Sequence, residues 1–203
     1  LGKPRISSIL ITHGHGDHIG GLDRLQQVLG CPVRCHPKLE PLLTQRLGPG
    51  CVQKLGSRDT VATGGRNTFR VLFTPGHEDD HVAYYMAKGR VLFSGDTILG
   101  NSSSSVRNLK QYMSSLDLMA RQRPDVICPG HGQIIQNATQ RIQWYIGHRQ
   151  QREEQVLAAV EAGVKAVDEI VGQVYPRTLR KNLREAAARN VRTHLAKLTE
   201  EKR

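Results

Sequence analysis

THGHGDHIGG, at residues 12–21, places three histidines and an aspartate within six positions of one another. The segment follows residues 6–12, which are apolar and β-branched and predict a buried strand. Loops at strand ends commonly carry functional side chains, because the strand supports them rigidly. Gly14 and Gly16 let this loop turn tightly enough for its neighbours to converge. Its candidate metal ligands are His13, His15, Asp17 and His18, in the pattern H-x-H-x-D-H.

Three more candidate ligands follow other predicted strands, and each stands beside a glycine. They are His77 in TPGH, Asp96 in SGD and His131 in PGHG. Five of the nine histidines therefore lie in strand-end segments. A single histidine of this kind is usually an ordinary polar residue. The whole set predicts a metal site, because imidazole and carboxylate together suit zinc and related divalent ions.

Strand and helix patterns alternate up to Asn137. Further strands are predicted at residues 31–36, 69–76, 81–87, 90–96 and 125–132, and helices at residues 21–29 and about 108–121. This alternation is typical of an α/β layered domain, which we place at residues 1–137.

The tail, residues 138–203, shows no strand pattern. Helices are predicted at about residues 138–162, 166–175 and 178–202, and Pro176 breaks the second. The last helix is amphipathic, and its apolar face comprises Leu179, Leu183, Val191, Leu195 and Leu198. We expect a helical linker followed by a small second domain.

The chain is basic, with a formal net charge of +11. Residues 1–137 hold 16 Lys and Arg against 10 Asp and Glu, and the 66 tail residues hold 13 against 8. This balance favours a polyanionic partner, nucleic acid or an anionic membrane surface, but a merely soluble basic protein is equally compatible with it. No apolar run approaches the roughly 20 residues that span a bilayer, so no transmembrane segment is expected.

The four cysteines do not form a recognisable metal motif. Cys31 and Cys35 with His36 could form half of a zinc knuckle, but a second Cys/His pair at the usual spacing is missing. We expect free thiols, as in a reducing compartment.

The segments THGHGDHIGG, TPGHEDDH, FSGDTILG and PGHG, in this order, resemble the motifs of the metallo-β-lactamase superfamily. The resemblance implies an αββα sandwich, with two mixed sheets between layers of helices. It also implies two metal positions, one held by His13, His15 and His77, the other by Asp17, His18 and His131, with Asp96 as the bridge. Asp80 and His81 are expected to orient ligands rather than to bind metal.

Such a pair of ions has defined chemistry. Two divalent ions about 3.5–4 Å apart can hold a hydroxide near neutral pH, because coordination lowers the pKa of water to about 7. They also neutralise charge on an attacked phosphoryl or carbonyl oxygen. Asp17 would aim the hydroxide and is the expected catalytic residue. We expect Zn²⁺, with Mn²⁺ as the alternative.

The substrate is not set by the fold, since the superfamily hydrolyses lactams, thioesters and phosphodiesters. Only 34 residues separate Asp96 from His131, which excludes the large domain that many RNA-processing relatives insert there. The tail is unlike the glutathione-binding tail of glyoxalase II. The segments SGDTILG and IGHRQQRE are similar to the lactamase-beta-like 2 family of single-strand-specific endoribonucleases, and this resemblance runs over about residues 6–197.

The second resemblance implies cleavage of single-stranded RNA, a winged-helix tail and a mitochondrial matrix location, with the cytoplasm as the alternative. Basic residues of the last helix can share one face, and cations near a helix N-terminus are locally unfavourable, which suggests phosphate contact. A solvated face is the alternative. The basic residues that can share this face are Arg177, Lys181, Arg184 and Arg192. His148 and Arg149 are further candidates, for RNA contact or for packing between the domains.

The sequence departs from this family in three places. From the resemblance we expect further strands before residues 12–21 and a wing hairpin after the last helix, and we interpret this sequence as an N-terminally truncated member. Arg107 and Lys110 stand where acidic residues are expected. A thioester hydrolase of the glyoxalase II type and a non-catalytic nucleic-acid-binding fragment remain alternative functions.

Overall fold

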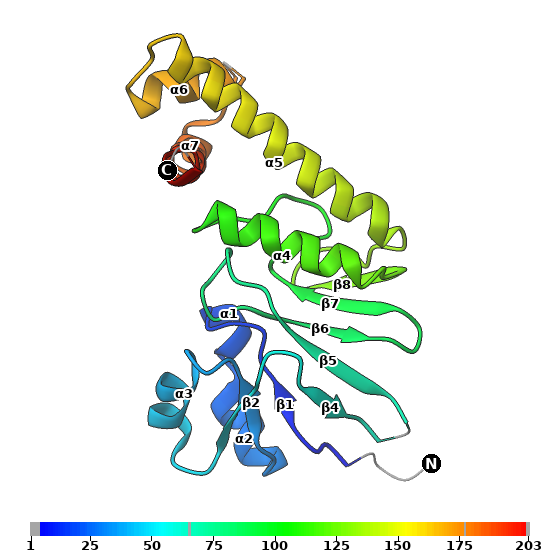
Figure 1. The fold of residues 1–203 in the computed structure, drawn as a ribbon. Coiled ribbons are helices and arrows are strands. Elements are labelled where there is room, and N and C mark those ends of the chain that lie inside the picture. Colours follow the sequence, from blue (N-terminus) through cyan, green and yellow to red (C-terminus); the bar gives the residue numbers. More distant parts are fainter. Residues whose placement is uncertain (1–4, 65, 177, 202–203) are drawn as a thin grey trace.

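The computed structural model of the chain describes residues 5–64, 66–176 and 178–201. Within these ranges the first part of the chain forms two sheets that face each other (Figure 1). The first sheet has three parallel strands, β1 (Ile9–Leu10), β2 (Val33–Cys35) and β3 (Val52–Lys54), side by side in that order.

The second sheet has five strands that are neighbours in chain order. They are β4 (Thr60–Ala62), β5 (Thr68–Phe73), β6 (Val82–Met86), β7 (Val91–Gly95) and β8 (Val126–Pro129). The pairs β4–β5, β5–β6 and β6–β7 are antiparallel, whereas β8 runs parallel to β7. This sheet is therefore mixed, as predicted. The sequence patterns located β5 to β8 but missed β3 and β4, which have only three residues each.

Helices cover the outer faces of both sheets. The helices α1 (Gly16–Ile19), α2 (Leu22–Leu29) and α3 (Glu40–Leu47) pack on the first sheet, where Leu22 and Leu43 are buried with Val33. The helix α4 (Leu109–Arg121) and the first half of α5 (Ala138–Glu161) cover the second sheet (Figure 1). This arrangement confirms the predicted αββα order of layers. The short helix α1 and the helix α3 were not predicted.

The two sheets are joined through the inner face of β6. Tyr84 is buried between them, and its hydroxyl donates a 2.6 Å hydrogen bond to the carbonyl oxygen of Ile11. The strand predicted at residues 6–12 is shorter than expected, because only Ile9–Leu10 pairs with β2 and Ile6 is 46% exposed.

The helix α5 is tied to the loop that follows β7. The Tyr145 hydroxyl accepts from the Leu99 N–H at 2.9 Å and donates to the Ser102 carbonyl at 2.7 Å. Arg149 is only 3% exposed, and its guanidinium donates to the Ser104 carbonyl. A side chain so enclosed does not reach RNA, so that prediction for Arg149 is wrong. The alternative, packing between α5 and the first domain, describes its role.

A separate apolar cluster lies in the tail. It is formed by the end of α5, by α6 (Val167–Val174) and by α7 (Lys181–Glu201). The helix α7 begins three residues later than predicted, so Leu179 precedes it but still packs against this cluster. Leu183 is 47% exposed, which contradicts its predicted place on the apolar face. Arg177 lies outside the described residues. None of the described helices is long and apolar enough to cross a membrane.

A histidine without hydrogen bonds is buried where α7 packs on α5. His194 is completely enclosed, and among the described residues neither ring nitrogen has a hydrogen-bond partner. The Glu153 carboxylate lies 3.7 Å from its Nδ1 atom, but Glu153 is also paired with Lys197 at 2.7 Å. Burial, with Arg149 and Arg152 nearby, lowers the pKa of His194 to about 3.

This pKa predicts a loss of stability in mild acid. The unfolded imidazole, with a pKa near 6.5, takes up a proton first, so stability is full above pH 6.5 and falls as the pH drops toward 3. We expect His194→Met to remove this dependence, which amounts to about 1.4 kcal/mol per pH unit. Urea denaturation of both proteins at pH 7.5, 6.0 and 5.0 measures the difference. Parallel pH profiles would contradict it.

Candidate metal centre

The seven predicted ligands meet at one end of the second sheet. His77 follows β5, Asp96 follows β7 and His131 follows β8, while the H-x-H-x-D-H loop follows β1 of the facing sheet. Close packing holds them there, since a side chain at Gly130 would collide with the Asp96 carboxylate. Gly95 has a φ of 49°, and a Cβ atom there would lie 2.6 Å from His81 Nε2.

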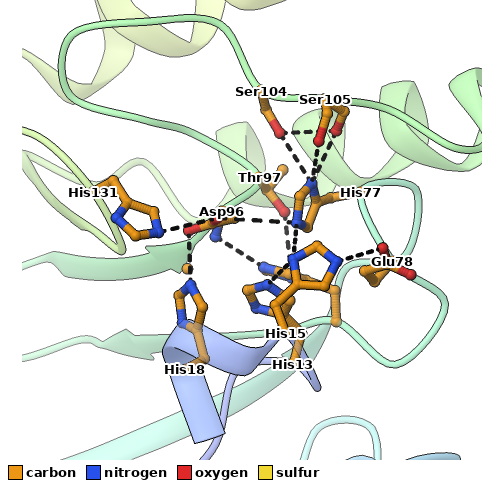
Figure 2. Close-up of polar contacts among 12 residues, drawn as sticks. His13, His15, His18, His77, Glu78, Asp96, Thr97, Ser104, Ser105 and His131 are labelled. Atoms are coloured by element: carbon orange, nitrogen blue, oxygen red, sulfur yellow. Dashed lines mark hydrogen bonds and ion pairs between the residues drawn. The ribbon is translucent and has the colours of Figure 1, made fainter. Parts of the chain in front are cut away.

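One group of ligand atoms surrounds His15. Its Nδ1 atom lies 3.0 Å from His13 Nε2 and 3.3 Å from His77 Nε2, and Asp96 Oδ2 is 4.0 Å from His77 Nε2 (Figure 2). Ligand atoms about 2.0–2.1 Å from a tetrahedral ion stand about 3.3 Å from one another. The spacing of the three imidazoles therefore fits a zinc-sized cation.

A second group lies on the other side of Asp96. His131 Nε2 is 2.9 Å from Asp17 Oδ2, and His18 Nε2 is 3.8 Å from the same oxygen. The Asp96 carboxylate lies 3.4 Å from His18 Nε2 and 3.5 Å from His131 Nε2. Figure 2 shows Asp96 between His131, His18 and His77. Asp96 is thus within reach of both groups, as a bridging ligand requires.

Two atoms of the cluster lack a partner. Among the described residues, His18 Nε2 and Asp96 Oδ1 are buried and accept no hydrogen bond. Leaving such a group unsatisfied costs about 1–3 kcal/mol. A divalent cation between the two atoms would remove that cost, so the residues fit a metal ion.

Burial keeps the inner imidazoles neutral, which is the form that binds metal. Burial, together with neighbouring His18, His77 and His15, lowers the pKa of His13 to about 3. Burial also lowers the pKa of His77. The Nδ1 atom of His77 lies 2.9 Å from the Ser105 carbonyl oxygen, which can only accept a hydrogen bond. The proton of neutral His77 is therefore on Nδ1, and Nε2 has a free lone pair.

Asp80 and His81 contact the backbone beside ligands. Asp80 Oδ2 accepts from the Gly14 N–H at 3.0 Å. His81 Nε2 accepts from the Asp96 N–H at 3.1 Å, and its Nδ1 lies 2.8 Å from the Thr74 hydroxyl. Complete burial holds the pKa of His81 well below its usual value, so Nε2 stays free to accept. This is the geometry of orienting residues, and neither side chain belongs to the ligand groups.

Glu78 and Arg107 complete the site and were not identified from the sequence. Glu78 Oε1 lies 2.7 Å from His15 Nε2 and 2.9 Å from Arg107 Nε. The Arg107 N–H donates to the Gly76 carbonyl at 2.8 Å, which fixes Arg107 beside the His77 turn. The carboxylate holds the His15 proton on Nε2, so Nδ1 faces the ligand group. The sequence feature that could have identified Glu78 is its position directly after the candidate ligand His77.

The residues predicted to contact RNA lie elsewhere. Lys181, Arg184 and Arg192 are exposed on α7, and Arg192 approaches Glu185 at 3.5 Å. His148 is partly buried, and its ring stacks on Trp144 with centroids 5.1 Å apart. None of these residues is part of the two ligand groups found among the described residues.

The contact between Glu78 and His15 should set metal affinity. We expect Glu78→Gln to weaken Zn²⁺ binding by about 10–100-fold, because carboxylates that hold a ligand histidine have effects of this size. Competition with a chromophoric chelator measures this without an activity assay. Asp79→Asn is the matched control, since Asp79 is exposed and contacts Lys38 at 3.4 Å.

Arg107→Gln should weaken Zn²⁺ binding by a smaller factor than Glu78→Gln. In a protein that already carries Glu78→Gln, it should have no further effect on Zn²⁺ affinity. Equal Zn²⁺ affinities for Glu78→Gln and Asp79→Asn would show that Glu78 does not support His15.

Comparison with known proteins identifies two matching families. Residues 1–131 match the metallo-beta-lactamase superfamily, and residues 166–203 match the beta-lactamase associated winged helix domain. The fold agrees, with a TM-score of 0.75 to a metallo-beta-lactamase family protein of Thermus thermophilus. That protein is 28% identical, and the match covers 97% of this chain and 75% of that one.

Two curated relatives match most of the chain. It is 36% identical to the beta-lactamase-like protein 2 homolog of Drosophila melanogaster, over 98% of this chain and 70% of that protein. It is 35% identical to the atrochrysone carboxyl ACP thioesterase of Aspergillus fumigatus, over 78% of this chain and 49% of that protein. With its αββα fold and its His/Asp cluster, the chain therefore belongs to the metallo-β-lactamase superfamily of hydrolases and carries a winged-helix domain after the hydrolase domain.

Proposed function

We propose that the chain is a metal-dependent endoribonuclease that cleaves single-stranded RNA. The observation that carries the proposal is the position of Asp96 between two groups of ligand atoms. In-line displacement at phosphorus develops charge on both the attacking and the leaving oxygen, and a pair of cations stabilises both. A bridged pair of sites suits a phosphodiester for this reason.

The bound ions, Zn²⁺ or Mn²⁺, would supply an acidified water and positive charge opposite the attacked phosphate. His13, His15 and His77 would hold one ion, Asp17, His18 and His131 the other, and Asp96 would contact both. The Asp17 side chain is 58% exposed, so it borders the open side of the cluster. Backbone hydrogen bonds, His18 and His131 lower the pKa of Asp17. Its carboxylate is therefore ionised at neutral pH and can accept a hydrogen bond from the attacking water, which would aim it.

The winged-helix domain supplies cations for the RNA backbone. Lys181 and Arg184 are exposed at the start of α7, and neither forms an ion pair with another described residue. Cations at this end of a helix oppose its dipole, so an anionic partner would stabilise them. We propose phosphate contact for both.

Thioester hydrolysis is the second candidate, favoured by the similarity to the Aspergillus fumigatus protein named as an acyl-carrier-protein thioesterase. The same residues would serve it, because an attacked carbonyl oxygen also becomes negative.

Parallel assays separate the two candidates. We expect the Zn²⁺- or Mn²⁺-loaded protein to cut a labelled single-stranded RNA internally, to stop when a chelator is added, and to leave S-lactoylglutathione and an acyl-carrier-protein thioester intact. Hydrolysis of a thioester without RNA cleavage would replace the first candidate by the second. RNA retention without turnover under any metal would identify a binding module instead.

The role of Asp17 has a separate test. We expect Asp17→Ala to lower the rate of RNA cleavage by more than about 100-fold, since it removes both a metal contact and the group that aims the water. The exposed side chain can be removed with little effect on folding, which thermal denaturation checks. Asp79→Asn again serves as the control. Undiminished cleavage by the Asp17 variant would rule out this mechanism.

A further inference from the structure

The end of the second sheet opposite the metal centre is strongly basic. The strand register places Phe69 beside Met86, Met86 beside Val91 and Val91 beside Val126, so the turns next to these residues adjoin one another (Figure 1). We define the basic end by the exposed cationic residues in and beside these turns, which are Arg66, Arg70, Lys88, Arg90, Arg121 and Arg123.

The positive charge of the basic end is largely uncompensated. Asp125 is the only acidic residue in the described parts of residues 64–70, 87–90 and 121–125, and it lies 3.1 Å from the Arg90 guanidinium. The other five cations form no ion pair within the described residues. Arg70 donates to the neutral side chain of Gln122 at 3.0 Å, which joins β5 to the end of α4. These segments therefore hold six cations and one carboxylate.

Three arginines of the basic end occupy turns in the left-handed backbone conformation. Arg66, Arg90 and Arg123 have φ values of 67°, 50° and 51°, in the left-handed region. That conformation costs a residue other than glycine about 1–2 kcal/mol. Arg90 has a structural reason to stand there, because it donates to the Arg123 carbonyl. Arg123 directly follows the Gln122 C-cap of α4, and its carbonyl oxygen accepts from the Arg90 guanidinium, so the turn itself fixes where these two cations lie.

We propose that the basic end is a docking surface for single-stranded RNA, which holds the strand at a distance from the cleavage point. The identity of this polyanion rests on the proposed function. Five of the six cations are arginines, whose planar guanidinium groups match phosphate oxygens with paired hydrogen bonds.

The basic end is well separated from the reacting atoms. The strand β6 has five residues and runs from the metal centre toward the basic end. At about 3.3 Å per residue it spans about 17 Å. A cation at the basic end therefore changes RNA binding without touching the bond that is cleaved.

Two matched triple variants of the full chain test the proposal. Arg66→Asn, Lys88→Gln and Arg121→Gln remove three cations from the basic end. Arg24→Gln, Lys54→Gln and Lys165→Gln remove three exposed cations elsewhere. Each variant lowers the formal net charge of +11 by three. Binding of a fluorescent 20-nucleotide single-stranded RNA is measured by anisotropy in EDTA, at several salt concentrations, so that no cleavage intervenes.

We expect the basic-end variant to bind at least tenfold more weakly at low salt. Its plot of log K against log salt should be shallower by about 2, since each lost phosphate contact contributes about 0.7 for single strands. The control should keep the wild-type slope. Equal losses in the two variants would overturn the proposal, as would wild-type binding to anionic vesicles but not to RNA.

If the proposed endoribonuclease function were wrong, the results would differ from those expected if only the docking surface were wrong. RNA that is bound through the basic end but never cut, with any metal, would refute the endoribonuclease and leave the surface intact. RNA that is cut equally well, with an unchanged KM, by the basic-end variant would refute the surface alone.

Discussion

The Asp96 carboxylate lies within 4.0 Å of three imidazoles from three separate segments, and much of the first domain serves to hold this arrangement. Side chains with free lone pairs do not cluster spontaneously in a protein interior, because each loses its hydration there. Three of the ligands are therefore held by a specific contact: Ser105 supports His77, Glu78 supports His15, and His81 supports the Asp96 backbone. The fold supplies this rigid frame, and a bound cation would supply the compensating charge.

The ligand residues could be predicted from the sequence because their signal is local. Each stands at a strand end, and all except His18 are beside a glycine. The strands β5 to β8 and the helices α4 and α5 have clear periodicity. The secondary structure of residues 37–62 could not be assigned from the sequence pattern, because its helix and strands are short and lie among prolines and glycines. Local periodicity cannot show that α3 packs on the first sheet.

Features that depend on tertiary contacts could not be predicted. The ion pair of Glu78 and Arg107 joins residues that are 29 positions apart. Arg149 is buried although arginine is rarely enclosed, because α5 packs against the loop between β7 and α4, where the Ser104 carbonyl accepts from its guanidinium. Leu183 fits the apolar spacing but is exposed, and it is not among the residues that pack in the apolar cluster of the tail. For Glu78 and Arg149 the residue that decides their place lies in a distant part of the sequence.

The contacts of α5 have a consequence for the modularity of the chain. Composition changes at Asn137, but Tyr145 and Arg149 lie beyond that point and hold the carbonyl groups of Ser102 and Ser104. The next carbonyl, that of Ser105, accepts from the candidate ligand His77. The first turns of the linker helix are thus mechanically part of the hydrolase domain. Truncation at residue 137 would remove the residues that hold the loop carrying Ser105, which supports the candidate ligand His77. Two separately folding fragments therefore require a boundary after Arg149.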